Sequence, residues 1–148
     1  MNQEQLIWQK ALDYLGIRFH SKYELRQKLT RHFPDEEEKI LKAIAEMERV
    51  ELLNDRRFTE QLVNSLIQKP IGRFKLMMEI KKRGLEPELA ENMLLNFGWS
   101  EEESAKKAIA EKERSLREPD ERKRKRKLMN FLQSRGFESA MIYKVLNF

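Results

Sequence analysis

Residue types that perform catalysis are sparse in this 148-residue chain. The two histidines, His20 and His32, fall near expected helix ends, without a spacing that would join them at a metal ion. No HExxH pair, glycine-rich phosphate loop or Gly-x-Ser-x-Gly elbow occurs. Acidic pairs such as Glu101 and Glu102 are what a charged helix start provides. Because cysteine is also absent, we expect no enzymatic activity, no metal and no cofactor.

A run of cations is the strongest candidate for binding chemistry. It consists of Arg122, Lys123, Arg124, Lys125, Arg126 and Lys127. On a helix these side chains point in all directions, so their repulsion favours a nearby anion. Glu118, Asp120 and Glu121 precede the run and offset only part of its charge. The hypothesis is a site for phosphates or for an acidic protein surface, and the alternative is a solvated helix start.

A second cationic set lies in the middle of the chain. Arg73 and Lys75 fall at an expected helix start, where the helix dipole disfavours cations, and this hints at binding. Lys81, Lys82 and Arg83 fall in the last turn, where the dipole alone explains them. We assign Arg73, Lys75, Lys81 and Lys82 to the candidate binding surface together with the run of six cations.

Few aromatic residues are available to stack on bases. Tyr23, Phe74 and Tyr143 could be exposed, but each also fits a core or boundary position. Helix–glycine–helix units could also form a helix-turn-helix motif. Their second helices begin with carboxylates, for example Glu86 and Glu88, which would repel phosphates. We therefore do not expect sequence-specific readout of the major groove.

The composition suits small helical units with much exposed surface. Charged residues make up 37% and hydrophobic residues 40%, and the formal net charge is 30 − 25 = +5. A basic balance permits binding to phosphates or acidic surfaces. No apolar run approaches the length of a membrane span, and the N-terminus lacks a signal-peptide pattern. We expect a cytoplasmic protein.

Helix caps, breaks and apolar periodicity predict nine short helices and no sheet. In the segment 72–94, Phe74, Met77, Met78 and Ile80 form one apolar side, Gly84 ends the helix and Pro87 begins the next. The other expected helices are 5–15, ended by Gly16; one opened by a capping box at Ser21 and Glu24; one begun at Pro34; one capped by Asn54 or Asp55; one opened by Ser100; and 121–134 and 139–147.

The nine helices fall into three sets of three. Ile80 and Leu132 are 132 − 80 = 52 residues apart, as are Gly84 and Gly136, and Leu29 precedes Ile80 by 80 − 29 = 51. A period near 50 indicates stacked helical repeats, here 1–53, 54–99 and 100–148. The alternative is three unrelated helix hairpins that share similar caps.

Four segments, in order along the chain, carry motifs of a known family. They are Ser21-Lys22-Tyr23-Glu24-Leu25-Arg26-Gln27-Lys28-Leu29, similar to S-x-x-E-L-x-x-K-L; Leu53-Asn54-Asp55-Arg56-Arg57-Phe58, similar to L-D/N-D-x-R-F; Gly72 with Glu79-Ile80-Lys81-Lys82-Arg83-Gly84-Leu85, similar to G…E-L-x-x-K-G-I; and Phe131-Leu132-Gln133-Ser134-Arg135-Gly136-Phe137, similar to F-L-x-x-R-G-F/Y. Together they resemble RecX proteins, the regulators of the bacterial recombinase RecA. The chain departs from that pattern at Glu51-Leu52, where Gly-Tyr is usual, and at Arg31-His32-Phe33, where Lys-Gly is common.

The resemblance implies an all-α, elongated and curved stack of three three-helix repeats without chemistry of its own. It implies binding to the RecA filament on single-stranded DNA, and with this a limit on filament growth, ATPase, strand exchange and co-protease activity, in DNA repair, homologous recombination and the SOS response. We expect a monomer that also binds duplex DNA weakly. Two rivals remain: a general DNA-binding accessory module, and an adaptor whose partner is another protein.

The remaining motif residues are expected to be structural. They are Ser21, Glu24, Leu25, Lys28, Leu29, Asp55, Arg57, Phe58, Gly84, Arg135, Gly136 and Phe137. Among them, we expect Asp55 to cap a helix, Phe58 to lie in the core and Arg57 to form an ion pair between repeats.

Overall fold

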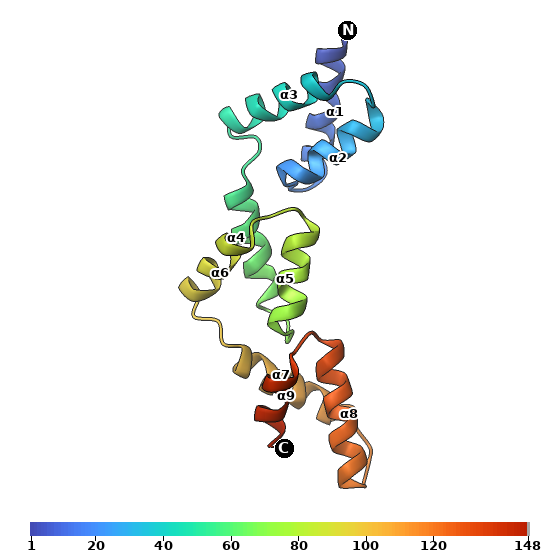
Figure 1. The fold of residues 1–148 in the computed structure, drawn as a ribbon, viewed down its shortest axis with the longest axis vertical. Coiled ribbons are helices and arrows are strands. Elements are labelled where there is room, and N and C mark those ends of the chain that lie inside the picture. The colour runs from blue at the N-terminus through green and yellow to red at the C-terminus, as the bar shows by residue number, and fades with distance from the viewer. Residues whose placement is uncertain (148) are drawn as a thin grey trace. The chain divides into compact units, whose positions relative to one another are not determined.

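The computed structural model describes residues 1–147, and within them it contains nine α-helices and no strand (Figure 1). The helices are α1 (Gln3–Ile17), α2 (Lys22–His32), α3 (Glu37–Arg49), α4 (Asp55–Leu66), α5 (Arg73–Lys82), α6 (Pro87–Asn96), α7 (Glu101–Ser115), α8 (Glu121–Ser134) and α9 (Ser139–Leu146). The all-α class expected from the sequence is confirmed.

Several of these helices have an N-cap side chain that accepts a backbone N–H of the first turn. The Ser21 hydroxyl accepts the N–H of Glu24, whose carboxylate accepts the N–H of Ser21 in return, so the predicted capping box is present. Ser100 and Asp120 cap α7 and α8 by accepting backbone N–H groups in the first turn. Each contact spans three residues, and the sequence alone predicted the caps at Ser21 and Ser100.

Two predicted helix boundaries were wrong. Gly16 does not end the first helix but lies inside α1, which continues to Ile17 before Arg18 turns to an extended conformation. The third helix begins at Glu37 and not at Pro34, because the N–H of Glu36 donates to the carbonyl of Phe33 in a turn. At the other glycine stops, Gly84 and Gly136 adopt the positive φ angles that favour glycine.

The chain divides into two compact units. Unit 1 contains Met1–Gln61 and Ile80–Leu89. In it α1, α2 and α3 pack against one another in pairs, as Figure 1 shows. Their shared core consists of Ile7, Ala11, Leu25, Leu29, Ile40, Ile44, Met47 and Leu53.

Unit 2 contains Leu62–Glu79 and Ala90–Phe148. Here α7, α8 and α9 pack in pairs, so the last three helices repeat the arrangement of the first three (Figure 1). Their core consists of Ala105, Ala108, Leu132, Phe137 and Ile142.

The predicted apolar side of α5 was wrong for two residues. Phe74 and Met78 are 58% and 54% exposed, whereas Leu76 and Ile80 are fully buried. Both pairs have the four-residue spacing of one helix face, but a shift of two residues turns the side chain through about 200°. Periodicity alone could not show which of the two pairs faces the core.

Candidate functional site

The six-cation run forms the first two turns of α8, and the structure divides it into paired and unpaired members. Arg124 forms an ion pair with Glu113 of α7 at 2.6 Å, and Lys127 pairs with Glu118 at 3.1 Å. Hydrogen bonds from Lys127 and from the Asp120 N–H hold the pKa of the Glu118 carboxyl below its usual range. Within residues 1–147, Arg122 and Arg126 are exposed and form no ion pair. Arg122 and Arg126 therefore lie one turn apart on one face of α8, and Lys123 is a further exposed cation of the run without an ion pair in that range.

That face of α8 borders an open hollow of about 660 Å³, here called the α8–α9 hollow. Its lining residues are Arg122, Lys125, Arg126, Met129 and Tyr143. The four α8 residues follow the spacing of one helix face, and Tyr143 comes from α9. The Lys125 ammonium also donates to the carbonyl of Asn147 at 3.3 Å. Two guanidinium groups beside a phenol ring can bind an anion that carries a planar group.

The second cationic set is not brought together in the same way. The Arg73 guanidinium pairs with Glu91 at 2.5 Å and lies 5.3 Å from the centre of the Trp99 ring, so internal contacts already engage it. Lys75 in unit 2, and Lys81 and Lys82 in unit 1, are exposed and form no ion pair among the described residues. Of this set, these lysines remain available to an acidic partner.

A junction in unit 1 joins the start of α2 to the glycine turn after α5. The Ser21 hydroxyl, besides capping α2, donates to the carbonyl of Arg83. Gly84 lies against the Tyr23 ring, where a Cβ atom would overlap the ring. The Asp55 carboxylate accepts the N–H of Lys22 at 2.9 Å. The first turn of α2 is thus held from two sides.

Unit 2 contains the equivalent junction between the start of α5 and the glycine turn after α8. Gly72 donates its N–H to the carbonyl of Arg135 at 2.8 Å, and Phe74 donates to the carbonyl of Gly136 at 3.2 Å. The Glu101 carboxylate accepts the N–H of Arg73 at 2.6 Å. Each unit therefore places a carboxylate from the start of a later helix on the first N–H of a middle helix.

The motif around Asp55 differs from expectation in two details. Asn54 caps α4, because its side-chain oxygen accepts the N–H of Arg57 at 3.1 Å, whereas Asp55 caps α2. The expected ion pair of Arg57 between repeats was wrong: in the described part of the chain this exposed side chain forms no ion pair. Phe58 is buried as expected, with its ring stacked on that of Phe19.

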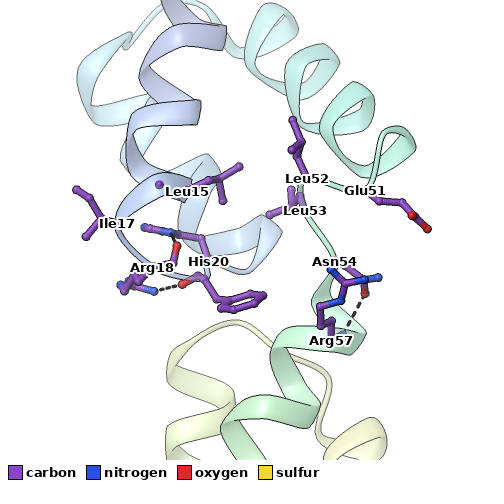
Figure 2. A pocket seen from close by; sticks show the side chains of 11 residues that line it. Leu15, Ile17, Arg18, His20, Glu51, Leu52, Leu53, Asn54 and Arg57 are labelled. Carbon is purple, nitrogen blue, oxygen red and sulfur yellow. Dashed lines mark hydrogen bonds between the residues drawn. The ribbon is translucent and has the colours of Figure 1, made fainter.

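A second hollow, of about 370 Å³, lies in unit 1 between the α1–α2 connection and the α3–α4 connection. Figure 2 shows Arg18 and His20 on one side of it, and Leu53, Asn54 and Arg57 on the other. Arg18 already binds the carbonyl of Phe19 and the carboxylate of Glu24. Arg57, which also lines this hollow, forms no ion pair within residues 1–147. Among the described residues, the hollow therefore has one unpaired arginine, whereas the α8–α9 hollow has two.

His20 is buried and has a structural environment. Its Nδ1 lies 3.0 Å from the carbonyl of Arg18, which places the proton on Nδ1, and its Nε2 lies 2.8 Å from the Lys28 ammonium. Burial, together with the charges of Arg18 and Lys28, lowers the pKa of His20, and burial also lowers the pKa of Lys28. A neutral imidazole thus accepts a hydrogen bond from the motif lysine.

The Glu24 carboxyl is the charged centre of the same region. Burial acts to raise its pKa, but hydrogen bonds from Arg18 and the Ser21 N–H, and the charges of Arg18 and Arg83, hold the pKa below its usual value.

Across residues 1–147 no cluster of three or more potential metal ligands occurs. The same residues include no helix that is long and apolar enough to cross a bilayer.

Sequence reasoning missed the partners that lie far away along the chain. Glu113 as the partner of Arg124 and Glu101 as the cap of α5 are 11 and 28 residues from their contacts. The available signal for Glu101 was the repeat itself, because Asp55 and Glu101 occupy corresponding places at the start of α4 and α7. Tyr143 was named from the sequence as a candidate stacking residue, and its side chain is 52% exposed.

Comparison with known proteins links this geometry to one family. Three family models match in succession: RecX, first three-helix domain, over residues 8–44; RecX, second three-helix domain, over residues 54–94; and RecX, third three-helix domain, over residues 100–146.

Individual relatives match over most of their length. The chain is 34% identical over 142 residues to the regulatory protein RecX of Prosthecochloris aestuarii, covering 93% of this chain and 89% of that one. It is 36% identical over 137 residues to that of Pelodictyon phaeoclathratiforme, covering 92% and 84%.

Solved structures show the same fold. A crystal structure of RecX from Lactobacillus salivarius has a TM-score of 0.74 at 20% identity, covering 97% of this chain and 94% of that one. A crystal structure of regulatory protein RecX has a TM-score of 0.80 at 21% identity, covering 98% and 73%.

Proposed function

The chain belongs to the RecX family of regulatory proteins, and from that premise we propose that it regulates a RecA-type recombinase, mainly as an inhibitor. It binds the recombinase filament on single-stranded DNA and limits filament growth, ATPase, strand exchange and co-protease activity. It acts as a cytoplasmic monomer, by binding and not by catalysis. The observation that carries the proposal is the ordered match of all three RecX domains along one chain.

The charge distribution supports a target that presents phosphates or acidic side chains. Arg122 and Arg126 on α8 and Lys75 on α5 are exposed cations without ion pairs inside the described residues. A filament on DNA offers both kinds of anion to such side chains. Arg73, Arg124 and Lys127 contribute less, because carboxylates of the chain already neutralise them.

The repeat boundaries 1–53, 54–99 and 100–148 are part of the same proposal. The two equivalent junctions support them, since each joins the middle helix of one proposed repeat to the glycine turn of the next. Stacked units of this kind expose the outer sides of several helices to one partner.

A set of three binding titrations separates this proposal from its rivals. Fluorescently labelled protein is titrated with the cognate recombinase assembled on single-stranded DNA, with bare DNA, and with recombinase alone, each across a salt series. The proposal predicts the tightest binding to the assembled filament at physiological salt. Equal affinity for bare DNA would favour a general DNA-binding module, and binding that ignores nucleic acid would favour a protein adaptor.

A further inference from the structure

The α8–α9 hollow has a composition that sets it apart from the rest of this highly charged surface. Among the described residues that line it there are three cations, one methionine and one tyrosine, and no carboxylate. The chain carries 25 acidic residues, and none among the described residues pairs with the two arginines of this lining, Arg122 and Arg126.

The nearest acidic partners of the run neutralise other members of it. Glu113 holds Arg124 and Glu118 holds Lys127, and neither glutamate lines the hollow. Arg122 and Arg126 stand one helical turn apart, so both guanidinium groups can reach one anion bound between them. Arginine binds phosphate through paired N–H donors, which gives direction as well as charge.

Tyr143 supplies an aromatic surface beside those arginines. More than half of its side chain is exposed (52%), and with Met129 it forms the uncharged part of the lining. A volume of about 660 Å³ lies within the range of about 300–1,000 Å³ of sites that hold small organic groups. The hollow therefore has room for a planar base next to the phosphate.

We propose that the α8–α9 hollow binds a nucleotide of single-stranded nucleic acid, with Arg122 and Arg126 on a backbone phosphate and Tyr143 stacked on a base. This inference rests on the proposed function. It assigns the α8–α9 hollow to the nucleic acid of the filament and not to the recombinase. An unpaired strand is required because bases inside a duplex do not expose their faces for stacking. The same contact is independent of base identity, since every base has such a face.

The test uses the full chain and labelled oligothymidine without recombinase, followed by fluorescence anisotropy across a salt series. The R122Q/R126Q variant should bind at least about tenfold more weakly at low salt, with the slope of log K against log salt reduced by about 0.7, because the two arginines share one phosphate. The Y143L variant should bind about fivefold or more weakly with an unchanged slope, and Y143F should bind like the parent protein.

The matched control is R124Q/K127Q, which removes the same charge from the same helix at the ion-paired positions. It should weaken oligothymidine binding by less than about threefold. Equal losses in the two double variants would overturn the proposal, because net charge alone would then explain the binding. Circular dichroism melting of every variant separates lost binding from lost folding, and the abasic oligonucleotide described below tests stacking on the parent protein if Y143L unfolds.

Two further probes identify the occupant. An abasic oligonucleotide of equal length should bind the parent protein more weakly than oligothymidine, and Y143L should bind both equally. If polyglutamate competes as well as oligothymidine at equal charge concentration, the hollow takes an acidic protein segment and the proposal fails. If R122Q/R126Q keeps full affinity for oligothymidine while recombinase inhibition persists, the hollow is wrong but the proposed function stands. If the parent protein binds oligothymidine through these residues but does not inhibit the recombinase, the hollow is correct and the proposed function fails.

Discussion

His20 shows how a motif lysine can be held by a neutral side chain. Its pKa is lowered from 6.5 by burial, and the adjacent charges of Arg18 and Lys28 lower it further. As the pH falls through about 6.5 the unfolded chain takes up a proton first, while the native imidazole stays neutral to lower pH. The His20 contribution to stability is therefore fully present above 6.5 and is lost as the pH falls toward the native pKa.

We predict that the H20Q variant loses less stability than the parent protein between pH 7.5 and 5.5, measured as the midpoint of urea unfolding, because glutamine cannot be protonated in this range. Burial raises the pKa of the Asp55 carboxyl, so its contribution to stability increases as the pH falls, opposite in sign to that of His20 and at more acidic pH. This contribution is the same in the parent protein and in H20Q. H32Q is the matched control substitution, since it replaces an exposed histidine with the same residue. An H20Q curve parallel to that of the parent would contradict the assignment.

Neighbouring residues in the Asp55 motif should differ sharply in their effect on stability. R57A should change the free energy of unfolding by no more than about 0.5 kcal/mol, because the side chain is exposed and forms no ion pair within residues 1–147. F58A should cost about 3–5 kcal/mol, because it empties a buried site against Phe19. Chemical unfolding measures both, and a loss of more than about 2 kcal/mol in R57A would show a missed structural contact.

At the scale of elements, replacing Gly72 and Gly16 with alanine should change stability in opposite directions. Gly72 meets the backbone of Gly136 and Phe137 so closely that a Cβ atom would overlap it, whereas Gly16 lies within α1 with open space around it. G72A should therefore destabilise the protein by about 2–3 kcal/mol or more. G16A should stabilise it by about 0.5–1 kcal/mol, because alanine restricts the unfolded chain and favours the helix. Thermal unfolding would contradict this account if the two variants shifted the midpoint in the same direction.

What the sequence could predict depended on the distance between partners. Ser21 and Ser100 cap helices by accepting N–H groups three positions away, so their roles followed from local pattern. The adjacent Asn54 and Asp55 offered two candidates for one cap, and the choice depended on α2, whose first N–H binds the Asp55 carboxylate. The pairing of Arg124 with Glu113 required α7 and α8 to pack, which no local rule contains.

For the whole molecule, the recurring feature is the junction between a middle helix and a later glycine turn. Ser21 meets Arg83 in unit 1, and Gly72 meets Arg135 in unit 2. Corresponding residues of the two junctions are offset by 72 − 21 = 51 and 135 − 83 = 52 positions, which is the internal period. The glycines and their spacing were visible in the sequence, and they predicted the repeat. The contacts that use them were not, because they involve backbone carbonyls that carry no residue-specific signal.

The most direct test of the central claim is the single-stranded-DNA-dependent ATPase of the cognate recombinase, with this protein added well below the recombinase concentration. The account predicts strong inhibition at that small ratio, because limiting filament growth affects many recombinase subunits at once. It also predicts weaker inhibition by R122Q/R126Q than by R124Q/K127Q, since only the first pair is exposed without carboxylate partners in the described chain. Inhibition that appears only when the protein saturates the DNA would contradict the account and indicate simple competition for phosphates.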